Sequence, residues 1–231
     1  MNAALLLLAD GRFPAGGHVH SAGIESAVAE GRVTDLPTLA DYVRGRLSTV
    51  GLTDAALSAA TVVHVSAATD EDERRAIVER LDLEADARIP APPLRDASRR
   101  QGRQLVRVAG RSWPSALLAT VASVRPSGVH VSIALGATAV VAGLDEHDVA
   151  GLSLHHAVTT PTQAALRLLG LDPFAVAALA VELAAEGEAV AAHAADLGAT
   201  AAFDELPAAS GPVVDLAACE HQRWDMRLFA T

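Results

Sequence analysis

Apolar residues recur at helical spacing along almost the whole chain, and this pattern limits the fold more than any other feature. Leu39, Val43 and Leu47, for example, fall on one side of a helix. Strand-like alternation is almost absent, because its one candidate, His130–Ile133, continues into an alanine-rich run with helical spacing. The pattern therefore predicts an all-α protein.

The composition indicates how such helices pack. Aromatic residues make up only 3% of the chain, although hydrophobic residues make up 51%. The core must then be built from Ala, Leu and Val, which let helices approach closely, and Ala is the strongest helix former. Across 231 residues there is no convincing internal repeat or low-complexity linker, so we expect a single-domain bundle of roughly nine to ten helices. The expected helices are Ser21–Glu30, Leu36–Val50, Thr53–Ala68, Asp70–Asp86, Leu94–Ala109, Pro114–Val124, Gly128–Ala142, His147–Val158, Thr162–Leu169 and Pro173–Ala195.

The two ends of the chain differ from this helical body. Residues 10–20, DGRFPAGGHVH, contain a proline and three glycines, which cannot sustain a helix, so they are expected to form a glycine-rich loop. Residues 200–231 contain two prolines and a glycine and then an amphipathic segment, Asp215–Phe229. We predict a helical domain over residues 1–199, followed by a flexible tail over residues 200–231 whose amphipathic segment binds a partner.

Charge and residue usage exclude several classes of function. The net charge of −10 argues against nucleic-acid binding. All 18 basic residues are Arg, so there is no lysine for a P-loop, a Schiff base or a general base. Cys219 is the single cysteine, which rules out an internal disulfide and a multi-cysteine zinc site and fits a reducing cytosol. No catalytic motif such as GxSxG or HExxH occurs, so we predict a binding protein with no cofactor, not an enzyme.

The chain also lacks the sequence features of a membrane protein. Met1–Ala9 is apolar, but it has no basic n-region and no small-residue cleavage site, so it does not resemble a signal peptide. The longest apolar stretches are Val129–Leu144 and Phe174–Val181, and both fall short of the roughly 18–20 residues that a membrane span needs. We therefore expect a soluble, cytoplasmic protein.

Nine histidines raise the question of metal binding. His18 and His20 lie in the glycine-rich loop, where they could ligate a metal ion or could simply pack or face solvent. His155 and His156 are neighbours on an expected helix and point about 100° apart, so they cannot easily chelate one ion. The sequence leaves His18 and His20 as the one candidate metal pair.

A row of arginines is the most unusual charge feature. Arg95, Arg99, Arg103, Arg107 and Arg111 recur every four residues, so the row drifts by only about 40° per step around a helix. One interpretation is a solvated helix face that pairs with the acidic helix at 70–86. The other is a docking surface for an acidic partner, because arginine suits bidentate contacts with carboxylates. The sequence leaves both open.

Three stretches, taken in order, resemble the UreF family of urease accessory proteins. The first is residues 5–33, LLLLADGRFPAGGHVHSAGIESAVAEGRV, and the second is residues 94–108, LRDASRRQGRQLVRV. The third is residues 220–231, EHQRWDMRLFAT, and the helical stretches between them also fit in order and length. Two positions depart from the family pattern: His18 and His20 stand where the family usually has aromatic residues. The segment at 157–172 also lacks the family's common Gly-Gln after Pro-Leu.

The resemblance implies an all-α homodimer without enzymatic activity. It would be a urease maturation chaperone that bridges UreD (also called UreH) and the GTPase UreG for nickel insertion into apo-urease, with nickel handled by the partner complex. The alternative from the residues is a helical nickel carrier that uses His18 and His20. The resemblance implies that both chain ends contact UreD; we add the central motif to the predicted partner-binding residues, which are Phe13, Pro14, Gly16, Gly17, Ser21, Gly23, Glu25, Arg99, Gln101, Gly102, Arg103, Arg223, Arg227, Leu228 and Phe229.

Overall fold

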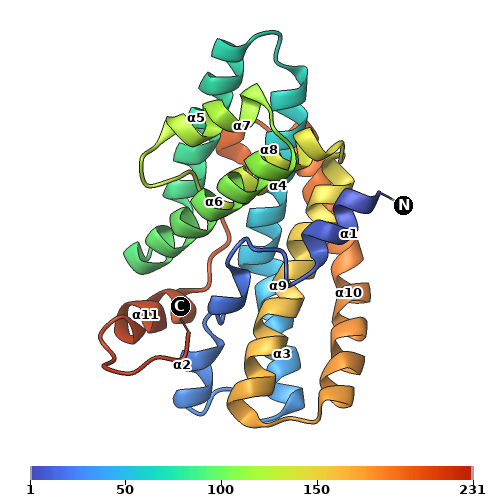
Figure 1. Ribbon diagram of the computed structural model, residues 1–231. Helices are drawn as coiled ribbons and strands as arrows, with labels where there is room; N and C mark the ends of the chain where they lie inside the picture. Colours follow the sequence, from blue (N-terminus) through green and yellow to red (C-terminus); the bar gives the residue numbers. More distant parts are fainter. Residues whose placement is uncertain (1, 230–231) are drawn as a thin grey trace.

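A computed structural model describes residues 2–229, with the exception of the His18 side chain, and within those residues every regular element is helical. The predicted all-α bundle is therefore confirmed (Figure 1). In chain order the elements are α1 (Ala3–Ala9), η1 (Gly17–Val19), α2 (Ile24–Ala29), α3 (Leu36–Arg46), η2 (Leu47–Gly51), α4 (Leu52–Ala67), α5 (Glu71–Ala87), α6 (Pro92–Ser112), α7 (Ala116–Val124), α8 (Val131–Ala142), α9 (Glu146–Leu169), α10 (Pro173–Thr200), η3 (Phe203–Glu205) and α11 (Pro212–His221).

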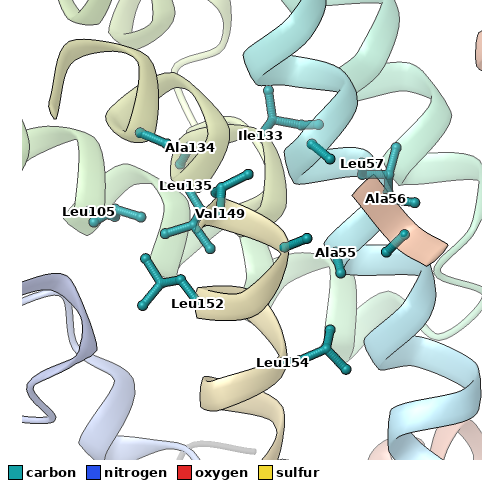
Figure 2. Close-up of a cluster of buried hydrophobic side chains, with 14 of the residues drawn as sticks. Ala55, Ala56, Leu57, Leu105, Ile133, Ala134, Leu135, Val149, Leu152 and Leu154 are labelled. Carbon is teal, nitrogen blue, oxygen red and sulfur yellow. The ribbon is translucent and has the colours of Figure 1, made fainter. Parts of the chain in front are cut away.

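Helix α4 lies at the centre of the bundle and packs against α5, α8, α9 and α10. Its alanines at 55, 56, 59 and 60 are completely buried. Figure 2 shows Ala55, Ala56 and Leu57 of α4 facing side chains from α8 and α9, among them Ile133 and Leu154. The core is thus aliphatic, as the scarcity of aromatic residues predicts.

Two glycines allow neighbouring helices to approach α4 closely. A Cβ atom added to Gly136 of α8 would lie 2.5 Å from the carbonyl oxygen of Ser58. A Cβ atom added to Gly198 of α10 would lie 2.6 Å from the Cβ of Ala59. Any larger side chain at either position would push these helices apart.

One long helical rod replaces two expected helices. The expected break between Leu36–Val50 and Thr53–Ala68 is wrong, because α3 continues into α4 through the π-helical turn η2. In this turn the Leu52 N–H donates to the carbonyl of Leu47, five residues earlier. By length and composition the rod Leu36–Ala67 could cross a membrane, but 61% of its most apolar window is buried inside the fold, as in the core helix of a globular protein.

Helix α9 also runs through an expected break. Separate helices at His147–Val158 and Thr162–Leu169 were expected, but α9 is continuous from Glu146 to Leu169 with Pro161 buried inside it. Proline removes one backbone donor from a helix interior. The hydroxyl of Thr162 donates to the carbonyl of Val158 at 2.9 Å, and tertiary packing on both sides of Pro161 keeps the helix together.

Candidate partner-binding face

The glycine-rich loop lies against α6. The rings of Phe13 and Trp113 have centroids 6.2 Å apart, and the Gln104 amide donates to the carbonyl of Pro14 at 3.0 Å. Gly16 has a φ of +84°, a conformation that glycine adopts without strain, and Gly17 begins η1. The loop therefore has a defined path across the helix that carries the arginine row.

The structure describes only part of the candidate histidine pair. His20 is buried, with 7% of its surface exposed, whereas the side chain of His18 lies outside the described part of the chain. Among the described residues no three His, Cys, Asp or Glu side chains gather as a metal site would require. Metal binding by His18 and His20 stays an untested alternative.

Glu25 of α2 joins the two ends of the chain. One carboxylate oxygen, Oε1, accepts a hydrogen bond from the backbone N–H of Leu228 at 2.7 Å. The other, Oε2, accepts from the N–H of Phe229 at 3.1 Å and lies 2.8 Å from Nε2 of His221. Glu25 itself is only 7% exposed. We call these four residues the Glu25 cluster; it attaches the C-terminal segment to the N-terminal region.

The turn before α2 positions Glu25. The expected helix start at Ser21 is wrong, because α2 begins at Ile24, after Gly23 with a φ of +85°. A Cβ atom added to Gly23 would lie 2.7 Å from the hydroxyl of Tyr42, and this hydroxyl donates to the carbonyl of Ala22 at 2.8 Å. Burial raises the pKa of Tyr42, although nearby arginines partly oppose this, so the phenol remains a donor at neutral pH.

Residues 200–229 fold back onto the body. Helix α11 lies against α2 and α6 (Figure 1), and the chain leaves the helix at His221, so the amphipathic segment expected over Asp215–Phe229 is helical only in its first half. Phe229 is buried, at 7% exposed, whereas Leu228 is 77% and Met226 is 88% exposed. The segment after α11 is therefore attached through its backbone and through the Phe229 ring, while the side chains of Met226 and Leu228 face outward.

The two tail arginines both face solvent. The side chain of Arg223 is 75% exposed and pairs with Glu220 at 3.1 Å, and Arg227 is also exposed. A surface pair of this kind contributes only about 0–1 kcal/mol to stability. Both guanidinium groups are therefore free to rearrange toward a charged partner.

A second cluster forms around Asp82, which is completely buried on α5. Its carboxylate accepts from Arg99 Nη1 at 3.0 Å, from Arg125 Nε at 2.6 Å and from the His130 backbone N–H at 2.9 Å. Arg99 also bonds to Asp86 through Nη2 at 2.6 Å. We call these five residues the Asp82 cluster; it joins α5, α6 and the segment between α7 and α8.

The protonation states of this cluster follow from burial and pairing. Burial works against the charge of Arg99, but its hydrogen bonds to Asp86 and Asp82 outweigh it and raise the Arg99 pKa. Burial would raise the Asp86 pKa, but hydrogen bonds from Arg99 and His130 outweigh it and lower that pKa. Burial lowers the pKa of His130, so its ring is neutral at neutral pH.

The motif at Ser98–Arg103 builds the contact between α6 and the start of α8. The Ser98 hydroxyl accepts from the backbone N–H of Val131 at 3.1 Å and lies 3.0 Å from Nδ1 of His130. A Cβ atom added to Gly102 would lie 2.1 Å from the carbonyl oxygen of Val129, so only glycine fits there. Gln101 is half-buried and Arg103 is exposed. Most of this motif therefore stabilises the fold. The partner-binding role predicted for Arg99, Gln101, Gly102 and Arg103 stays a prediction.

The two ends of the arginine row on α6 have different surroundings. Arg99 pairs with the acidic helix α5, and Arg95 donates to the carbonyl of Ile89 at 2.7 Å. Arg103, Arg107 and Arg111 are exposed, and within residues 2–229 they make no ion pair. One end of the row therefore holds the fold together and the other end faces solvent.

Sequence reasoning missed Asp82, His130 and His221. Asp82 occupies the apolar face of α5 beside Val78 and Leu81, and an acid at such a position is a signal that was available in the sequence. His221 had no such signal, because its partner Glu25 is 196 residues away in the chain.

Comparisons with known proteins match the chain to one family. The UreF family model matches residues 33–184. A urease accessory protein UreF from Mycobacterium sp. (strain JLS) is 41% identical over 227 residues, covering 98% of this chain and 97% of the relative. The namesake from Mycolicibacterium vanbaalenii is 40% identical over 233 residues, and that from Mycobacterium tuberculosis (strain H37Rv) is 38% identical over 230 residues; each alignment covers 99% of this chain and 98% of the relative. The chain thus belongs to the UreF family.

Proposed function

We propose that this protein is a urease maturation chaperone that bridges UreD (UreH) and the GTPase UreG while nickel is inserted into apo-urease. Membership of the UreF family over nearly the full chain is the observation that carries the proposal. The curated relatives are named accessory proteins of urease and not urease itself, which supports a role without catalysis. Nickel is the cargo of the assembly, and the cytoplasm is where the complex would form.

The contact between the two ends of the chain supports a docking role for α11 and the segment after it, which we call the terminal surface. Exposed apolar side chains gather on α11 and on the segment after it, at Val213, Leu216, Met226 and Leu228. Exposed apolar residues on neighbouring segments are typical of a protein-binding surface. Because Glu25 holds the same segment through backbone hydrogen bonds, a partner would meet these side chains already arranged.

Co-purification with UreD and UreG tests the proposal. The full chain should retain both proteins, and a variant that lacks residues 226–231 should lose UreD. The substitution Leu228→Asp should weaken UreD binding at least tenfold, whereas Leu83→Asp, on an apolar residue of α5 that is also exposed, should leave it within twofold. If the intact chain retains neither protein, the bridging role is rejected.

The homodimer is part of the same proposal. Helix α10 carries the exposed apolar residues Phe174 and Val181, which are 84% and 72% exposed. Light scattering on the purified chain should give twice the mass of 23.7 kDa.

Equilibrium dialysis with nickel addresses the carrier alternative, since a tight site that persists in a His18→Ala, His20→Ala variant would exclude that pair.

A further inference from the structure

A groove of about 530 Å³ lies between α6 and α7, on a part of the molecule that the terminal surface does not include. Its apolar lining comes from Val106 of α6, Leu118 and Val121 of α7, and Val129 before α8. A volume of this size is typical of sites that accept side chains or small ligands. We call this feature the α6–α7 groove.

The charge around the groove has one sign. Arg103, Arg107 and Arg125 line it, and no Asp or Glu is among its lining residues. This is unusual for a chain with 28 acidic and 18 basic residues and a net charge of −10. The groove is therefore a positive, apolar-floored site on an otherwise acidic protein.

The arginines differ in how they are held. Arg103 and Arg107 are exposed and make no ion pair within the described chain. Arg125 pairs with Asp82 at 2.6 Å, yet 38% of its side chain remains exposed. Two exposed guanidinium groups and one that Asp82 holds in place thus surround the apolar floor.

The walls of the groove are fixed by the fold. A Cβ atom added to Gly128 would lie 2.6 Å from the Cβ of Arg103, so this wall is in tight contact with α6. The Asp82 cluster holds Arg125 and the backbone of His130 on the same wall. A preformed site avoids much of the ordering cost that weakens binding to flexible surfaces.

We propose that the α6–α7 groove docks an acidic peptide segment of a partner protein, with one or two apolar side chains on the floor and carboxylates against Arg103 and Arg107. Arginine binds carboxylates in a bidentate geometry, and the apolar floor is what such a segment needs for its other face. The net charge of −10 disfavours a nucleic acid as the occupant, because its phosphates would be repelled by the acidic chain. This docking role depends on the groove alone and not on the bridging of UreD and UreG.

Fluorescence anisotropy with the full-length chain tests the proposal. The probe is a labelled 14-residue peptide with Glu and Leu at helical spacing, which combines negative charge with an apolar face. We expect saturable binding that weakens as salt increases. The double variant Arg103→Gln, Arg107→Gln should weaken binding at least tenfold. Absence of saturable binding to the wild-type chain, or equal binding of the same peptide with Arg in place of Glu, overturns the proposal.

Two matched variants separate the groove from general electrostatics. Arg100→Gln, Arg111→Gln removes the same charge from exposed positions of α6 that do not line the groove, and it should change affinity less than twofold. Ala119→Trp fills the groove from an exposed position of α7 without changing charge, and it should weaken binding as strongly as the double variant. Equal losses in the two double variants, unchanged binding in Ala119→Trp, or competition by inorganic phosphate at equal concentration would each overturn the proposal.

Discussion

Two buried carboxylates each gather several hydrogen bonds, but they join different kinds of structure. Asp82 accepts from two arginines and a backbone N–H, and it connects three segments within the body of the bundle. Glu25 accepts from two backbone N–H groups and lies beside a histidine, and it attaches a segment whose Met226 and Leu228 side chains face solvent. A buried carboxylate can thus join helices within the core in one place and attach a terminal segment to the surface of the bundle in another.

The largest effect is expected from Asp82→Asn. Without the carboxylate charge, the buried guanidinium of Arg99 loses one of its two acidic partners, and breaking a buried pair costs about 3–5 kcal/mol. Urea unfolding should show this loss. The control Glu79→Gln removes an exposed ion pair from the same helix and should cost less than about 1 kcal/mol. Equal losses in the two variants would mean that Asp82 is not central to the body.

Gly102→Ala tests whether the tight contact beside the Asp82 cluster is as demanding as its geometry implies. The new methyl group would meet a backbone carbonyl at 2.1 Å, so the helix or the loop must move, at a cost of about 3 kcal/mol. Gly110→Ala on the same helix meets no atom within 4 Å and should instead stabilise the protein by about 0.5–1 kcal/mol. Thermal unfolding should show a lower Tm for Gly102→Ala and a higher Tm for Gly110→Ala. A change of the same sign in both variants would contradict the tight contact at Gly102.

The contact between α1 and α9 gives a third point of comparison. His156 of α9 forms a hydrogen bond with the backbone of Leu8 in α1. Burial, with a smaller contribution from His155, lowers the pKa of His156 to about 4. The unfolded chain binds a proton near pH 6.5 and the folded chain only near pH 4, so stability is lost as the pH falls through this window. The loss from this group is about 2 kcal/mol at pH 5.

The substitution His156→Gln should remove that loss. The measurement is the difference in unfolding free energy between wild type and variant at pH 7.5 and at pH 5, with His193→Gln, at an exposed position, as the control. Wild type and variant must be compared at each pH, because burial also raises the pKa of Asp54 to about 6. Protonation of Asp54 stabilises the folded chain as the pH falls, which is opposite to the effect of His156. An identical pH dependence in wild type and His156→Gln would contradict the burial of a neutral ring.

The smallest effect on global stability is expected from Glu25→Gln. The amide keeps one acceptor oxygen but loses the charge, so the unfolding free energy should fall by only about 1 kcal/mol. Trypsin cleavage at Arg223 and Arg227, followed by mass spectrometry, should nevertheless become several-fold faster, while Glu30→Gln should leave it unchanged. A loss of stability as large as that of Asp82→Asn would place the tail within the core and end the distinction between the two clusters.

Local patterns predicted the helices well, and their failures have physical causes. The break expected at Pro161 did not occur, because buried packing along α9 outweighs one missing donor. The break near residue 51 became a π-helical turn, which has no simple signal in the spacing of apolar residues.

The candidate site was less accessible to sequence reasoning. A row of arginines at four-residue spacing cannot reveal that Arg99 turns inward, since its partners Asp82 and Asp86 lie on another helix. Glu25 was named as a partner-binding residue, but its contact with Leu228, 203 residues away, depends on tertiary structure alone. The predicted binding roles of both residues remain predictions.

The π-helical turn at Leu47–Gly51 has a consequence for changes in chain length. A π turn places one residue more in a helix than a regular α-helix of the same span would hold, and the flanking helices keep their facing. Deleting a single residue within this turn should therefore restore a plain α-helix without rotating α4 relative to α3. The same deletion within α4 would turn every following side chain by about 100° and expose the alanine face. The rod thus contains one place where its length can change while its neighbours stay in register.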